Sequence, residues 1–142
     1  MSRWTLAAAA LSLCFLSHAA WAEMVHFHAN MTGAAEVPPK TTQGKGQADA
    51  TLDTNTHVLT YTVTYSDLSG PATMAHFHGP ADPGANAGVV VPFNPPANPI
   101  KGTVTLTEAQ QKDLMDGKWY ANVHTAANPP GEIRGQMMRV GS

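Results

Sequence analysis

The sequence has little cysteine, little charge and little helical periodicity. Its one cysteine, Cys14, lies in the amino-terminal leader described below, so the rest of the chain can form neither a disulfide nor a thiolate metal site. Charged residues make up 13% of the chain and the formal net charge is −2, which excludes a strongly basic nucleic-acid-binding surface. Stability must therefore come from the packing of a core, with help from any ligand that binds only the folded form.

The first 22 residues have the pattern of a secretory signal peptide. Arg3 precedes a mostly apolar run over residues 6–15, and Ala20-Trp21-Ala22 forms an A-x-A cleavage motif. This run is shorter than the ~20 residues that span a bilayer, so we expect no membrane anchor after cleavage. We therefore predict a periplasmic or secreted mature protein that consists of residues 23–142 and folds as a single domain.

Beyond residue 23 the hydrophobic pattern has a period of two, with frequent interruptions by turn-forming residues. This pattern is typical of an all-β sandwich or barrel. The clearest segment is residues 58–66, where Leu59, Tyr61 and Val63 alternate with threonines. We predict strands over residues 25–31, 46–52, 58–66, 74–78, 89–92, 102–106, 119–124 and 132–140.

Only one segment is predicted to be helical. Residues 108–116 follow Thr107, and Gln110 stands three residues after that threonine, which is the spacing of a capping box. Gly117 is placed to end the helix. We interpret this segment as a short connector between strands.

Five of the six histidines beyond the leader form two His-x-His pairs and one single residue. The pairs are His26-Phe27-His28 and His76-Phe77-His78, and the single residue is His124. In a strand, residues i and i+2 share a face, so each pair presents two imidazoles on one side and its phenylalanine on the other. One pair alone is also typical of exposed strand histidines, but the repeat together with His124 favours a metal site. The candidate ligands are His76, His78 and His124, with His26 and His28 as further candidates. His57 stands alone beside a predicted turn and is expected at the surface.

The predicted ligands indicate which metal to expect. Imidazole sites suit copper, zinc, iron or nickel, and affinity peaks at Cu(II), so we expect one copper ion with zinc as the competitor. The thioethers of Met24, Met74, Met137 and Met138 lie close in sequence to the histidine strands and would suit Cu(I), although methionine commonly fills cores. Binding is expected to fail below pH ~6.5, where an ordinary histidine becomes protonated.

Three motifs resemble the CHRD domain, a family named after chordin. They are Ala34-Ala35-Glu36-Val37-Pro38-Pro39, the segment MAHFHGPA over residues 74–81, and the segment NVHTAANPPGEIRGQ over residues 122–136. Together they cover nearly the whole predicted mature chain.

A fainter resemblance links the order of the histidines to the copper ligands of Cu/Zn superoxide dismutases. Leu68, the pair His76-x-His78, a loop rich in proline and glycine, and then Val123-His124 follow in a similar order. This resemblance implies an antiparallel Greek-key β-sandwich of about eight strands with one short helix and a copper on its outer face. It places His76, His78 and His124 at copper-ligand positions and requires His26 or His28 for a fourth nitrogen.

Some dismutase features are missing from this chain. Residues 79–99 contain no histidine and Asp82 as their only acidic residue, so no zinc subsite is expected. No cysteine beyond the leader is present for the family disulfide. Arg134 is a candidate guide for a small anion, since guanidinium groups attract anions; the alternative is that Arg134 and Glu132, which share a strand face, pair with neighbouring charges.

Three functions are therefore considered. The first is an exported copper-binding protein for sequestration, delivery or resistance, with a periplasmic copper donor or acceptor as partner. The second is a copper-only, dismutase-like redox enzyme, and the third is a binding module without metal. We favour the first because the ligands are present while the accessory parts of a dismutase are absent.

Overall fold

The computed structural model describes Met1 and residues 21–141, so residues 2–20 of the predicted leader lie outside the described part of the chain. Within residues 21–141, nine strands, one α-helix and one 3-10 turn follow one another. In chain order they are β1 (Met24–Thr32), η1 (Gly33–Ala35), β2 (Lys45–Asp53), β3 (Val58–Ser66), β4 (Ala72–His78), β5 (Val89–Pro92), β6 (Ile100–Thr105), α1 (Glu108–Met115), β7 (Tyr120–Thr125), β8 (Ile133–Gln136) and β9 (Met138–Arg139).

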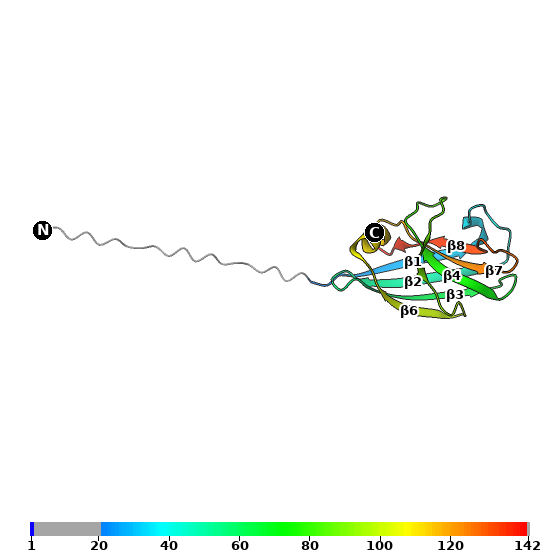
Figure 1. Cartoon of the computed structure of the whole chain (residues 1–142), viewed down its shortest axis with the longest axis horizontal. Coiled ribbons are helices and arrows are strands. Elements are labelled where there is room, and N and C mark those ends of the chain that lie inside the picture. Colours follow the sequence, from blue (N-terminus) through cyan, green and yellow to red (C-terminus); the bar gives the residue numbers. More distant parts are fainter. Residues whose placement is uncertain (2–20, 142) are drawn as a thin grey trace.

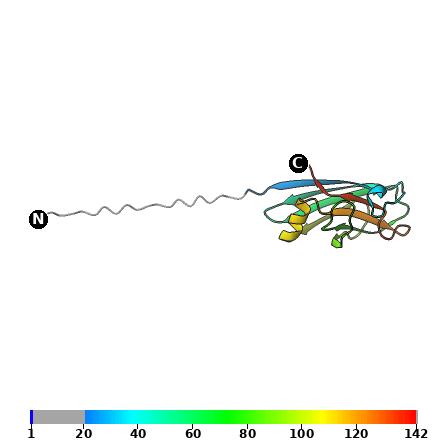
Figure 2. The same cartoon turned by 90° about the horizontal axis from the view of Figure 1, so that it is seen from above.

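The strands form one antiparallel sheet that curls over on itself. Their order is β5-β4-β7-β8-β1-β2-β3-β6, and β9 pairs with β1. Although β3 and β4 are far apart in this order, the rings of Tyr61 and Phe77 lie 5.3 Å apart, so the two ends of the sheet face each other. Figures 1 and 2 show the curl from two directions. The predicted all-β antiparallel sandwich is confirmed.

The core fills the inside of this curl. In β3, Leu59, Tyr61 and Val63 are buried, as their alternation with threonine predicts. The largest fully buried side chains include Phe27 from β1, Phe77 from β4 and Trp119, which directly precedes β7. Large aromatic side chains supply much of the apolar area that folding removes from water, and this burial stabilises the folded chain.

The local turn and cap signals are confirmed. The Asp53 carboxylate accepts hydrogen bonds from the amides of Asn55 (2.9 Å) and Thr56 (3.1 Å) in the β2–β3 hairpin. The capping box is complete, because the Thr107 hydroxyl accepts from the Gln110 amide and the Gln110 side chain accepts from the Thr107 amide.

The predicted last strand, residues 132–140, is wrong as one continuous element. It divides into β8, which pairs with β7, and β9, which pairs with β1. The break falls at Met137, whose side chain is fully buried and whose amide donates to the Trp119 carbonyl at 2.9 Å. Sequence alternation alone does not reveal the break, because Met137 continues the inward-facing pattern of Ile133.

Candidate metal centre

The alternation of side chains in β4 separates the core from the histidines. Ala75 and Phe77 point inward and are buried, whereas His76 and His78 lie on the outer face of the sheet. The neighbouring strand β7 presents His124 on the same face, because Asn122 pairs with His76 and His124 follows two residues later. The local pattern of the sequence and the register of two adjacent strands thus bring three imidazoles together.

The three imidazoles converge on one point. One nitrogen from each of His76, His78 and His124 lies within 4.8 Å of the others, and no further group of three or more histidine, cysteine or acidic side chains in the described residues could hold an ion. The ring centroids of His76 and His124 are 5.1 Å apart, and those of His76 and His78 are 5.3 Å apart. With metal–imidazole bonds of ~2.0–2.1 Å, two ligand nitrogens lie at most ~4.2 Å apart, so small side-chain movements would bring these three nitrogens within bonding distance of one ion.

Backbone carbonyls fix the tautomers of two rings. The Nδ1 atom of His78 lies 3.0 Å from the Ala87 carbonyl, and that of His124 lies 2.7 Å from the Pro129 carbonyl. A carbonyl only accepts, so both Nδ1 atoms must carry the proton and both neutral rings keep a lone pair at Nε2. Metal-binding histidines are commonly oriented by such hydrogen bonds.

The third ring has a free nitrogen. Nδ1 of His76 is buried and makes no hydrogen bond. A buried polar atom without a partner costs free energy, and a bound ion would supply the missing partner. The three residues therefore fit a metal ion.

The lowered pKa values of two rings keep them in the form that binds metal. Burial is the main cause that lowers the pKa of His76 to about 4, and the neighbouring His124 and His78 act in the same direction. Burial is also the main cause of the lowered pKa of His78. Neutral imidazole is the ligand form, so neither ring needs to lose a proton at pH 7.

In the metal-free protein, the C2 proton of His76 is expected to titrate with a midpoint near pH 4 in an NMR titration. In an unfolded chain a histidine ring nitrogen takes up a proton near pH ~6.5. The free energy of unfolding should therefore fall through the contribution of His76 as the pH falls from about 6.5 toward 4. This ring should then stay available to a metal ion below the pH ~6.5 expected from an ordinary histidine. A midpoint of His76 near 6.5 would contradict the partly buried placement of this ring.

The structure does not bring His26 and His28 to this group. Both lie on β1, where Nδ1 of His26 contacts the Thr51 hydroxyl at 3.0 Å and Nδ1 of His28 contacts Asp49 at 2.7 Å. Strand β8 separates β1 from β7, and the residue of β1 that pairs with β8 is Thr32. His28 stands four residues before it, roughly 13 Å along the strand. The dismutase-like expectation of a fourth nitrogen from β1 is therefore not met by this arrangement.

Of the four candidate methionines, one lies beside the three histidines. Met74 lies directly opposite His124 in the β4–β7 register and is 48% exposed. Met137 is core, and Met24 and Met138 are exposed on β1 and β9. Met74 is thus the thioether that the register places beside the histidines.

The Arg134 side chain binds the loop between β4 and β5. Its guanidinium lies 3.4 Å from the centroid of the Tyr120 ring and donates to Asn86 at 2.9 Å and to the Ala85 carbonyl. Only 2% of Arg134 is exposed, so it does not face solvent as an anion guide would. Nor does it pair with Glu132, which accepts from Thr42 and Ser69. Arg134 holds the loop whose Ala87 carbonyl orients His78.

Two residues near the site were not predicted from the sequence. Asn122 is 3% exposed, and its Oδ1 lies 3.0 Å from Nε2 of His78 and 2.9 Å from Nε2 of His124. The ring of Tyr120 stacks on His78 at 4.8 Å. Asn122 and Tyr120 stand two and four residues before His124, and this spacing could have predicted that they share its strand face.

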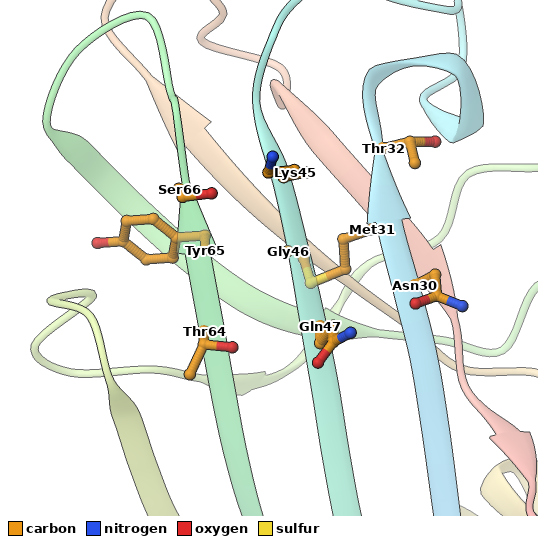
Figure 3. A pocket seen from close by; sticks show the side chains of 9 residues that line it. All are labelled: Asn30, Met31, Thr32, Lys45, Gly46, Gln47, Thr64, Tyr65 and Ser66. Atoms are coloured by element: carbon orange, nitrogen blue, oxygen red, sulfur yellow. The ribbon is translucent and has the colours of Figure 1, made fainter.

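A cavity elsewhere on the sheet has none of these features. It has a volume of about 430 Å³ and is lined by residues of β1, β2 and β3. Figure 3 shows Met31 directed toward Gly46, with Asn30 and Gln47 beside them. Its one charged side chain, Lys45, pairs with Asp67 at 3.4 Å.

The fold and site define an all-β domain with three converging histidines on its outer face. A family model described as the CHRD domain matches residues 27–137, and the chain belongs to this family. Neither the curated proteins nor the solved structures include a match to the chain. The described residues include no helix that is long and apolar enough to cross a membrane.

Proposed function

We propose that this protein is an exported copper-binding protein that holds one copper ion through His76, His78 and His124. The observation that carries the proposal is the set of three converging imidazoles. In His78 and His124 a backbone carbonyl accepts from Nδ1 and leaves the lone pair on Nε2, and in His76 the Nδ1 atom is buried without a partner. Its role would be sequestration, delivery or copper resistance, with a periplasmic donor or acceptor as partner.

Copper is favoured by the chemistry of the donors. For a given set of nitrogen ligands, divalent affinity peaks at Cu(II), and zinc follows as the competitor. The signal-peptide pattern supports an extracytoplasmic location, outside the tightly buffered copper pool of the cytosol. Met74 beside His124 adds a sulfur that suits Cu(I), should the ion be reduced.

The test is a metal titration of protein isolated from the periplasm and checked by mass for residues 23–142. We expect one equivalent of Cu(II), with nitrogen hyperfine structure in the electron paramagnetic resonance spectrum and tighter binding of copper than of zinc. Binding of zinc in preference to copper would overturn the choice of metal. Absence of any stoichiometric metal would leave the binding-module alternative.

A dismutase-like activity is the second candidate, favoured by one observation. His76 is only partly buried, so a bound ion would lie close to solvent on that side. Three protein ligands also leave positions on a copper ion for a small molecule. A superoxide assay of the copper-loaded protein separates the two candidates, because a carrier should leave superoxide decay at the rate of the metal-free protein.

A further inference from the structure

A buried carboxylate lies behind the candidate metal centre, on the other side of Asn122. Glu36 follows η1 and is 5% exposed, and its Oε1 makes no hydrogen bond. The side chains of Glu36 and Asn122 meet at Gly131, where a Cβ atom would come within 2.5 Å of Glu36 Oε1 and 2.6 Å of Asn122 Nδ2.

Gly131 allows this close approach in two ways. It has no side chain to occupy the space that Glu36 and Asn122 share, and its φ of 132° is one that other residues rarely adopt. The chain thus leaves room for a carboxylate next to the amide that touches two candidate ligands.

The hydrogen-bond chemistry around Asn122 is incomplete without a cation. His78 and His124 each carry their proton on Nδ1, so their Nε2 atoms present lone pairs to Asn122 Oδ1, which also has only lone pairs. If the amide were turned over, Nδ2 would donate to both Nε2 atoms and occupy the positions that a metal needs. The orientation of one amide therefore decides whether these two nitrogens are open.

The charge on Glu36 favours the open orientation. A carboxylate accepts hydrogen bonds and does not donate them, so it draws the NH2 group of Asn122 toward itself and directs Oδ1 toward the histidines. The candidate site has three imidazole ligands and no anionic ligand, so a negative charge close behind it would offset the nearby positive charge of Arg134 and stabilise a bound cation.

We propose that Glu36 is the positioning residue of the metal centre: through Asn122 it keeps Nε2 of His78 and His124 open, and it provides the negative charge that the three imidazoles lack. This inference rests on the proposed function, since it assigns a role at the same site.

The position of Glu36 is costly for folding, which argues against a purely structural role. Burial raises its pKa to about 7, although Arg134, Asn122 and Lys40 act in the opposite direction. Because this folded pKa lies above that of an unfolded glutamate, the stabilising contribution is present below about pH 4.3 and is lost as the pH rises through 7. Above pH 7 the ionised Glu36 therefore contributes no such stability.

The test is Glu36→Gln, which keeps the shape of the side chain and removes its charge. At pH 8 we expect the metal-free variant to have a melting temperature at or above that of the wild type, while its Cu(II) affinity falls by about 10-fold or more, the range measured for groups that orient metal ligands. Affinity is measured by competition with a chelator on the folded protein. A merely structural role would lower both quantities together.

Glu132→Gln is the matched control. Glu132 is also a buried glutamate, but its carboxylate accepts from the Thr42 hydroxyl at 2.6 Å and from the Ser69 amide at 2.9 Å. Its loss should reduce stability and leave the copper affinity of the folded protein unchanged.

A second variant tests the route through the amide. In an Asn122→Ala background, Glu36→Gln should weaken copper binding by a clearly smaller factor than in the wild-type background, because the effect through the amide is gone and only the effect of the charge remains. The same loss in both backgrounds would overturn the route through Asn122. Wild-type affinity in stably folded Glu36→Gln would overturn the role of Glu36 altogether, whereas failure of the wild type to bind copper would overturn the proposed function itself.

Discussion

Replacing His124 with alanine is expected to abolish stoichiometric copper binding, with a loss of affinity well beyond the ~10–100-fold typical of groups that only orient ligands. His124 is the one candidate ligand from β7, and the pair on β4 offers only two nitrogens without it. A titration followed by electron paramagnetic resonance measures both the stoichiometry and the number of coupled nitrogens. His76→Ala and His78→Ala should give the same result.

The fold should survive this substitution. His124 lies on the outer face of the sheet, and its loss removes the hydrogen bond to the Pro129 carbonyl, worth about 0.5–1.5 kcal/mol. His28→Ala is the matched control, because it removes a strand histidine that is held by Asp49 on β1. Equal loss of copper in the His28 and His124 variants would show that binding is not confined to the β4–β7 cluster.

The largest loss of stability is expected for Phe77→Ala, at about 3–5 kcal/mol. Phe77 is fully buried, and its ring packs edge-on against Tyr61 at 5.3 Å and Phe93 at 4.7 Å. Truncation leaves a cavity where the two ends of the curled sheet meet. The rings around this cavity are anchored on separate strands and loops, so they cannot easily move in to fill it. Urea unfolding followed by tryptophan fluorescence measures the change, with Trp119 at 5.7 Å from the Phe77 ring as the probe.

Val140→Ala serves as the control for Phe77→Ala. Val140 is 63% exposed, so its truncation should change the free energy of unfolding by no more than about 0.5 kcal/mol. A loss below 1 kcal/mol for Phe77→Ala would contradict the packing of β3 against β4.

The sequence predicted those parts of the structure that depend on neighbours along the chain. The strand at Val58–Ser66 was predicted with the bounds it has, since alternation is a local property. The capping box of α1 and the face of β4 that carries His76 and His78 depend on similarly short spacings. The meeting of His124 with this pair also followed, with help from the order of the motifs.

What the sequence did not predict depends on strand order and on the loops that cover the sheet. His26 and His28 have the same local pattern as the pair on β4, but β8 lies between their strand and β7. Arg134 has the alternation of an outward residue, and only the folded loop with Asn86 makes it buried. The meeting of Glu36 with Asn122 depends on a contact between segments 86 residues apart, which no local spacing encodes.

The two faces of β4 have a consequence for the working life of the protein. Phe77 and Ala75 stabilise the fold from one face, while His76 and His78 belong to the candidate metal centre on the other. In small zinc domains the ion is part of the fold, and the chain unravels when the ion leaves. Here the metal-free protein should keep its fold, so a carrier of the proposed kind would load, release and reload its ion repeatedly without exposing an unfolded chain to proteases.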